Sequence, residues 1–253
     1  MARKRIAAVG DGGYFMLVPH NQEHSNLVVL RNTRRLTQKE KIEARRDAGK
    51  QPPNIEIDPK YARLMCRECS AINPNDIFDA GFDGDRTIRM KGDFGYSDDS
   101  FFLMNGRMVE ALQREMVTGF ETAPVGKDWF AVKITAIVTT SPGVWKSRGR
   151  KCRTCGRPEE MIGGYDRLSQ IGLPGGERTL FTPSGVHITG RQWFRVDVHT
   201  PMVSGDVVPI LLQNRIKGGA CRKLLSDQEW QTYIREARKS AVFLARPGVI
   251  TLR

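Results

Sequence analysis

Two Cys-x-x-Cys pairs carry the clearest chemistry in this sequence. The first pair is Cys66 and Cys69, and the second is Cys152 and Cys155. A gap of two residues lets both sulfurs of a pair reach one tetrahedral ion from a tight turn. Two such pairs complete a shell of four thiolates with Zn–S bonds of about 2.3 Å. The spacing therefore predicts one zinc site formed by Cys66, Cys69, Cys152 and Cys155.

The residues around these cysteines suit a structural metal. Four thiolates leave no open coordination position, so we expect the zinc to be structural and not catalytic. Ser70 and Gly156, which follow the second cysteine of each pair, are small enough to let backbone N–H groups bend back toward the sulfurs. Nearby cations would offset the formal charge of −2 on a zinc tetrathiolate; they are Arg67, Lys151, Arg153 and Arg157.

The predicted site is discontinuous, because 82 residues separate Cys69 from Cys152, whereas a compact zinc ribbon has about 15–20. Loop-closure entropy grows by only about 0.6 kcal/mol per doubling of length, so the longer loop costs roughly 1–1.5 kcal/mol more. Structural zinc contributes on the order of 10 kcal/mol in small finger peptides. The long insertion is therefore compatible with a shared site.

Two other interpretations of the cysteines stay open. The two pairs can be structural thiols that never meet. They can also be redox motifs, although neither opens a helix after a strand as a thioredoxin-like motif does. The fifth cysteine, Cys221, has no partner in the sequence and is most simply a small buried hydrophobe.

No other residues assemble into a recognisable catalytic set. His20 and His24 are four residues apart but lie in a polar loop without the glutamate of a zincin motif. The acidic residues of segment 76–99 lack the series of an EF-hand, so we expect a solvated acidic loop. Ser184 is not in a nucleophile elbow. We therefore do not expect an enzyme.

The chain is strongly basic. Forty Lys and Arg against 28 Asp and Glu give a net charge of +12 and a pI near 9.8. Such a charge favours nucleic acid or acidic protein surfaces as partners. Segment 146–157 places six cations and no acid beside the second cysteine pair, an arrangement suited to phosphate contacts.

Neither a membrane protein nor an exported protein is expected. The 253 residues contain no apolar run near the ~20 residues that a membrane-spanning helix needs. The amino-terminal Met1-Ala-Arg-Lys-Arg is basic, but the apolar stretch that follows ends at Gly10, too soon for a signal peptide. We expect a cytoplasmic protein.

Hydrophobic patterning predicts several strands and a few helices. A β-hairpin is expected over 5–9 and 14–18, and further strands over 26–30, 129–139, 185–189, 193–198, 207–212 and 248–252. Capping boxes at Thr37-x-x-Glu40 and Ser226-x-x-Glu229 predict helices over 37–48 and 226–241. Met108, Leu112 and Met116 form an apolar stripe that predicts an amphipathic helix over 106–118. Segment 61–100, which precedes it, is expected to be mostly loop.

These elements define the expected fold class as α+β: a mixed, mostly antiparallel sheet with two or three helices and a discontinuous zinc knuckle of four cysteines. Residues 1–50 would form an amino-terminal strand region with a basic helix. Residues 51–253 would form an α+β domain with the two knuckles, which can be continuous with 1–50.

The arrangement resembles a known family. Two distant Cys-x-x-Cys pairs enclose the segment Phe101-Phe-Leu…Val109-Glu-Ala-Leu-Gln…Gly119-Phe-Glu-Thr-Ala-Pro-Val125. This combination is similar to the bacterial double-CXXCG motif proteins, some of which are named as immunity proteins of polymorphic-toxin systems. The resemblance covers mainly 61–157, and the first knuckle departs from the pattern by ending in Ser70. It implies metal binding by the four cysteines and a toxin-like protein partner.

We therefore expect a non-enzymatic, zinc-binding protein that neutralises a cognate toxin by covering it. The alternative is a zinc-ribbon protein that binds nucleic acid through segment 146–157.

Overall fold

The structure is a computed structural model that describes most of the chain. The described residues are 13–20, 27, 29–31, 55–84, 87–97, 99–163, 167–184, 187–191, 194–198, 200–239 and 246–253. No helix within these ranges is both long enough and apolar enough to cross a membrane. The expected strand 5–9 and the expected basic helix 37–48 lie outside the described residues.

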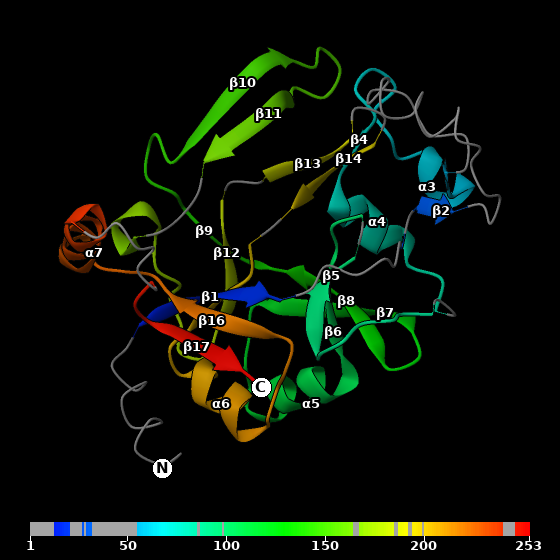
Figure 1. The fold of residues 1–253 in the computed structure, drawn as a ribbon. Coiled ribbons are helices and arrows are strands. Elements are labelled where there is room, and N and C mark those ends of the chain that lie inside the picture. Colours follow the sequence, from blue (N-terminus) through cyan, green and yellow to red (C-terminus); the bar gives the residue numbers. More distant parts are fainter. Residues whose placement is uncertain are drawn as a thin grey trace, which may run out of the picture.

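A six-stranded sheet forms the centre of the molecule (Figure 1). Every neighbouring pair in it is antiparallel except β12 and β9, which run parallel. Strand β1, from the first 50 residues, is bonded on both sides, to β15 and to β16. The strands in spatial order are β17 (Val249–Leu252), β16 (Gly219–Lys223), β1 (Tyr14–Pro19), β15 (Met202–Ser204), β12 (Leu180–Pro183) and β9 (Ala136–Val138).

An antiparallel four-stranded sheet packs against the first. Its strands in order are β5 (Phe94–Tyr96), β6 (Phe102–Asn105), β8 (Trp129–Ile134) and β7 (Phe120–Gly126). Helices α5 (Gly106–Arg114) and α6 (Val207–Gln213) lie beneath both sheets (Figure 1). The main core contains residues from both sheets and both helices, including Leu17, Met104, Leu112 and Leu211.

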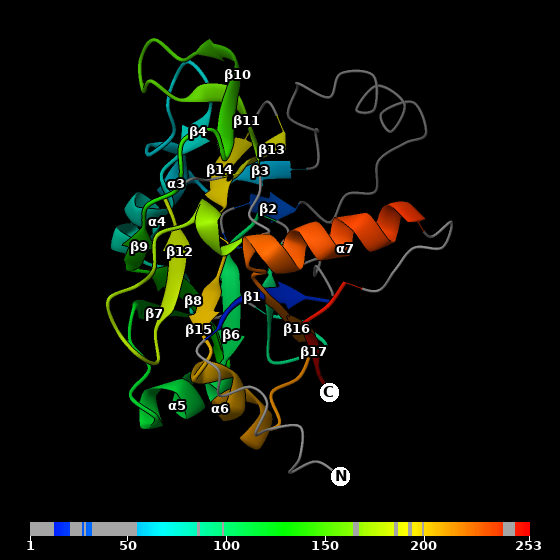
Figure 2. The same cartoon turned by 90° about the vertical axis from the view of Figure 1, so that its left-hand side faces the viewer.

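Smaller elements surround these two sheets. A three-stranded sheet has the order β13 (His187–Arg191), β14 (Phe194–Val198) and β4 (Ala71–Ile72). Two separate strand pairs are β10 (Trp145–Lys151) with β11 (Pro158–Gly163), and β2 (Val29–Arg31) with β3 (Ile55–Ile57). The other helices among the described residues are α3 (Pro59–Ala62), α4 (Pro74–Ala80), the 3-10 turn η1 (Leu168–Gln170) and α7 (Asp227–Lys239), which runs outward from the central sheet in Figure 2.

The expected fold class is confirmed: helices accompany mixed, mostly antiparallel sheets. The expected strand 129–139 is divided between the two large sheets. The break falls at Thr135, because the amides of Thr135 and Ala136 both donate to the carbonyl of Gly119, at 2.9 and 3.3 Å. β8 before the break and β9 after it therefore belong to different sheets.

Two expectations about elements were wrong, and one helix was not expected. Segment 207–212 forms helix α6 and not a strand, because a short apolar run fits a buried helix as well as a strand, and Val207, Val208 and Leu211 are buried there. Helix α5 ends at Arg114, and Met116 is 77% exposed instead of extending the buried stripe. Segment 61–100 lies mostly outside helices and strands, as expected, but it contains α4, whose start is marked in the sequence by the cap Asn73 and a first-turn proline.

Candidate metal centre

The four predicted cysteines converge on one point. The Sγ atom of Cys66 lies 3.7 Å from that of Cys152, and the Sγ atom of Cys69 lies 3.5 Å from that of Cys155. All four sulfurs lie within 4.8 Å of one another. A tetrahedron with Zn–S bonds of about 2.3 Å has S···S edges of about 3.8 Å. The sulfurs therefore already stand near the separations that a four-thiolate metal site requires.

Each cysteine pair lies on a turn with the same backbone hydrogen bonds. In the first turn, the amide of Cys66 donates to Ala71 and the amide of Ser70 donates to Cys66, both at 2.8 Å. In the second turn, the amide of Cys152 donates to Arg157 at 2.7 Å and that of Gly156 donates to Cys152 at 2.9 Å. The two turns are thus repeats of one knuckle, 86 residues apart.

The residue after the second cysteine has a left-handed backbone in both knuckles. Its φ angle is +56° at Ser70 and +73° at Gly156. Glycine adopts this conformation without strain, whereas a residue with a Cβ atom loses roughly 1–2 kcal/mol. This left-handed residue reverses the chain direction toward the start of the knuckle. Because glycine adopts this backbone with less strain than serine, the second knuckle has the more suitable residue at this position.

The pKa values of the thiols differ because backbone amides, burial and the neighbouring sulfurs act differently on each of them. The amides of Cys69 and Glu68 donate to the Cys66 sulfur and lower the pKa of this thiol to about 7. Burial, together with the neighbouring thiols, raises the pKa of Cys69 to about 12. The pKa of Cys152 is also raised: the Cys155 amide lowers it, but burial and the sulfurs of Cys155 and Cys66 outweigh this effect. Four thiolates at these distances need a cation to neutralise them.

A carboxylate joins the two knuckles independently of the sulfurs. Glu68, between the cysteines of the first knuckle, accepts hydrogen bonds from the hydroxyl of Thr154 at 2.8 Å and its amide at 3.1 Å. The amide of Arg153 adds a longer contact at 3.4 Å. The Thr154 hydroxyl and the Arg153 amide lower the pKa of the Glu68 carboxyl. The sequence did not predict the contact between Glu68 and Thr154. Both residues occupy variable positions inside the Cys-x-x-Cys motifs, which places them beside the cysteines.

The two knuckles are anchored very differently. The first lies between α3 and β4, and its flanking residues Tyr61 and Ile72 are completely buried in a second hydrophobic cluster. The second forms the turn between β10 and β11, a hairpin that projects at the margin of the molecule (Figure 1). Lys146, Arg150 and Lys151 of this hairpin are exposed. A metal held by both knuckles would therefore tie an exposed hairpin to a buried anchor.

One further contact connects the second knuckle to that anchor. The guanidinium of Arg157 donates to the carbonyl of Ile72 at 2.9 Å. Arg157 had been expected to balance the charge of the thiolates, and it also positions the end of the knuckle beside β4. Strand β4 in turn pairs with β14, in the small sheet next to the hairpin.

Residues outside the cysteine cluster have structural roles. Cys221 is buried in the main core, as expected, and burial raises the pKa of its thiol to about 12. The expected solvated acidic loop is wrong for Asp93 and Asp99, which are only 5% and 4% exposed. Asp93 accepts from the side chains of Asn105 and Arg107 and from the amide of Lys217, which fixes the start of α5.

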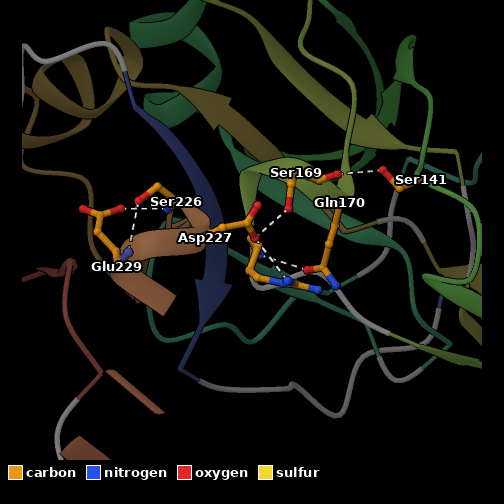
Figure 3. A network of polar contacts seen from close by, with 7 residues as sticks. Ser141, Ser169, Gln170, Ser226, Asp227 and Glu229 are labelled. Atoms are coloured by element: carbon orange, nitrogen blue, oxygen red, sulfur yellow. Dashed lines mark hydrogen bonds and ion pairs between the residues drawn. The ribbon is translucent and has the colours of Figure 1, made fainter. Parts of the chain in front are cut away.

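The predicted capping box at the start of α7 is confirmed. The amide of Ser226 donates to the Glu229 carboxylate at 2.7 Å, and the Glu229 amide donates to the Ser226 hydroxyl at 3.2 Å (Figure 3). The next residue, Asp227, accepts from the Ser169 hydroxyl at 2.8 Å and from the guanidinium of Arg167 at 3.1 Å. These hydrogen bonds attach the start of α7 to η1. Their geometry is that of a helix cap.

No protein-family model matches the chain, and no curated protein matches it. The geometry of the cysteine cluster defines the class of site: four cysteines that can hold one metal ion. Its function must be argued from this geometry.

The left-handed position of the knuckles yields a stability prediction. Ser70→Gly should raise the stability of the metal-loaded protein by about 1 kcal/mol, equivalent to roughly 2–4 °C in Tm, because it relieves the strained backbone. Gly156→Ala should lower stability by a similar amount. Calorimetry of the purified variants measures both shifts.

The matched control is Ser184→Gly, the same substitution at an exposed position without a left-handed backbone. It should destabilise slightly, since glycine gains more freedom on unfolding. If Ser70→Gly destabilises the protein as much as Ser184→Gly does, the strain argument is contradicted.

Proposed function

We propose that this chain is a non-enzymatic binding protein in which one structural zinc ion holds the β10–β11 hairpin against the first knuckle. The observation that carries this proposal is the approach of the four sulfurs to the edges of a zinc tetrathiolate tetrahedron. Thiolate ligands in tetrahedral geometry favour zinc among the common divalent metals, with iron as the competitor.

The closed ligand shell supports a structural role. Four protein ligands leave no position for a water or a substrate, whereas catalytic zinc keeps one open. The Glu68–Thr154 contact and the matched backbone turns position the ligands from outside the shell, as outer hydrogen bonds do in other metal sites. When bound, zinc supplies a neutralising charge and a crosslink between two distant segments.

Elemental analysis tests the shared site. The purified protein should contain one zinc per chain, and Cys66→Ser and Cys152→Ser should each lose it, because three thiolates bind zinc much more weakly than four. Cys221→Ala is the control, since Cys221 lies in the core outside the cluster, and it should keep its zinc. Unchanged zinc in either knuckle variant would refute the shared site.

For the biological role, we propose immunity against a cognate toxin. The support is the resemblance of the two Cys-x-x-Cys pairs and the segment between them to the double-CXXCG motif proteins. A net charge of +12 suits an acidic partner, since complementary charge speeds association and disfavours other partners. Neutralisation by covering a toxin needs a surface and no catalytic group.

Co-expression tests the immunity role. Each gene flanking this one should be expressed alone and together with the chain in a sensitive host. One flanking product is expected to arrest growth alone and to become harmless when the chain is present, with rescue lost in Cys66→Ser and kept in Cys221→Ala. If no flanking product is toxic, or if the chain does not relieve the toxicity, immunity is rejected.

Nucleic-acid binding is the second candidate, and the exposed cations of the hairpin favour it. Lys146, Arg150 and Lys151 lie along β10, and the exposed Arg153 lies in the knuckle that follows. Cations on one projecting hairpin can contact successive phosphates, which gives affinity that falls steeply with salt.

A gel shift at 50 mM salt tests this candidate. The triple variant Lys146→Gln/Arg150→Gln/Lys151→Gln should bind a duplex more weakly and reduce the slope of log affinity against log salt by roughly 2–3. The control, Lys91→Gln/Lys127→Gln/Arg253→Gln, removes three exposed cations elsewhere. Absence of any shift by the wild type, or equal losses in both variants, excludes this role for the hairpin.

A further inference from the structure

A groove borders the outer edge of the six-stranded sheet, beside β9. It has a volume of about 550 Å³ and is lined by β9, Thr139, the loop 172–176, Thr118 and Thr179. None of its lining residues is charged, although 27% of the chain is charged and its net charge is +12. The groove is therefore a neutral site on a strongly basic protein, and its lining offers no cation to a phosphate.

The backbone of β9 presents an open hydrogen-bonding position in this groove. The carbonyl of Val138 accepts from the Ser184 amide at 2.6 Å, so Val138 faces β12. Backbone groups alternate in direction along a strand, and Ile137 therefore directs its amide and carbonyl away from β12. Within the described part of the chain, neither group is paired on that side.

The chain's own segments limit the length of this open position. On the outer side, the Thr139 carbonyl accepts from the Gly172 amide at 2.7 Å and the Ser141 amide donates to the carbonyl of Gln170 at 2.9 Å. At the other end of β9, the Gly119 carbonyl accepts from the amides of Thr135 and Ala136 from a position beside β12, because Thr118 pairs with Thr179. Within the described residues, the open outer edge of β9 is therefore the backbone of Ile137.

Two of the exposed large apolar side chains line this groove. The large hydrophobic residues that are exposed in the described regions are Met116 (77%), Ile137 (59%), Leu173 (57%) and Val249 (48%). Ile137 and Leu173 line the groove. Met116 belongs to the turn after α5, which the guanidinium of Arg178 holds through the carbonyl of Glu115 at 3.3 Å, next to the lining residue Thr179.

The side chains of β9 do not protect it as an edge strand. Edge strands avoid pairing with other chains through charges, prolines, bulges or a short length; β9 is short, with three residues, but it reads Ala-Ile-Val and carries no charge or proline. The opposite edge strand, β17, is flanked by Pro247-Gly248 and by Arg253. The edge that borders the groove therefore has its short length and the segment 170–172, but no charge or proline, to limit pairing.

We propose that this groove binds an extended, uncharged apolar segment of a protein partner, which pairs its backbone with Ile137 and places a side chain against Leu173. The inference rests on the proposed role as a binding protein and names the surface used. Strand addition of this kind takes its affinity from main-chain hydrogen bonds and its specificity from alternate side chains. The lack of charge and the open backbone position at Ile137 favour this occupant over nucleic acid.

A displayed library of random heptapeptides, selected on the zinc-loaded full chain, tests the proposal. Enriched peptides should share an uncharged, alternately apolar centre, and synthetic copies should bind Ile137→Lys at least tenfold more weakly than wild type. Val249→Lys, the same change on the opposite edge, should bind like wild type. Methylation of the peptide's central backbone amides, one at a time, should abolish binding at the residue that pairs with Ile137.

Three results would overturn the proposal: no enrichment over selection on Ile137→Lys, equal binding to the two lysine variants, or tolerance of every backbone methylation. A concentration-dependent dimer in sedimentation, dissociated by Ile137→Lys, would assign the groove to a second copy of the chain instead. Zinc content and melting temperature, measured on each variant, confirm that it is folded. They also separate a failure here from a failure of the metal site.

Discussion

The structure around the cysteine cluster depends on one constraint. The two equivalent cysteine knuckles must bring their sulfurs together at one point. Cys66 and Cys152 begin identical knuckles 86 residues apart, and their sulfurs meet at separations close to those of a tetrahedral thiolate site. One knuckle is rooted in a buried cluster and the other forms the tip of an exposed hairpin. A metal bound by the four cysteines would therefore tie the hairpin, whose Lys146, Arg150 and Lys151 are exposed, to the buried cluster.

The segment between the knuckles explains how so distant a pair can share an ion. It is no flexible loop, because it forms the four-stranded sheet, helix α5, strand β9 and the first strand of the hairpin. The closure entropy of ~82 flexible residues, roughly 1–1.5 kcal/mol beyond that of a short ribbon, therefore overstates the cost. Folding of the intervening sheet brings the knuckles together, and contacts such as Glu68 with Thr154 align them. A metal ion would then bind to a largely formed site.

Sequence reasoning located the cysteine cluster well, because ligand chemistry imposes a short, local spacing on each pair. It also found the α7 capping box, since the two reciprocal bonds of Ser226 and Glu229 depend only on a separation of three residues. It failed where tertiary packing decides. The run 207–212 is helical because α5 and the sheets bury it, and the strand expected over 129–139 breaks where Gly119 captures two amides. The groove beside β9 is formed by segments that are far apart in sequence, so no local sequence pattern predicts it.

The hairpin and the groove give the molecule two surfaces of opposite character. The hairpin is cationic and lies beside the cysteine cluster, whereas the groove is uncharged and borders the edge of the central sheet. A binding protein can use both, with the charged surface guiding encounter and the apolar one giving a durable contact.

X-ray absorption at the zinc edge tests the central claim most directly. The account predicts a single shell of four sulfurs at about 2.3 Å in the metal-loaded protein. A shell with two sulfurs and two lighter atoms at about 2.0 Å would mean that each knuckle binds separately, and would contradict the shared site.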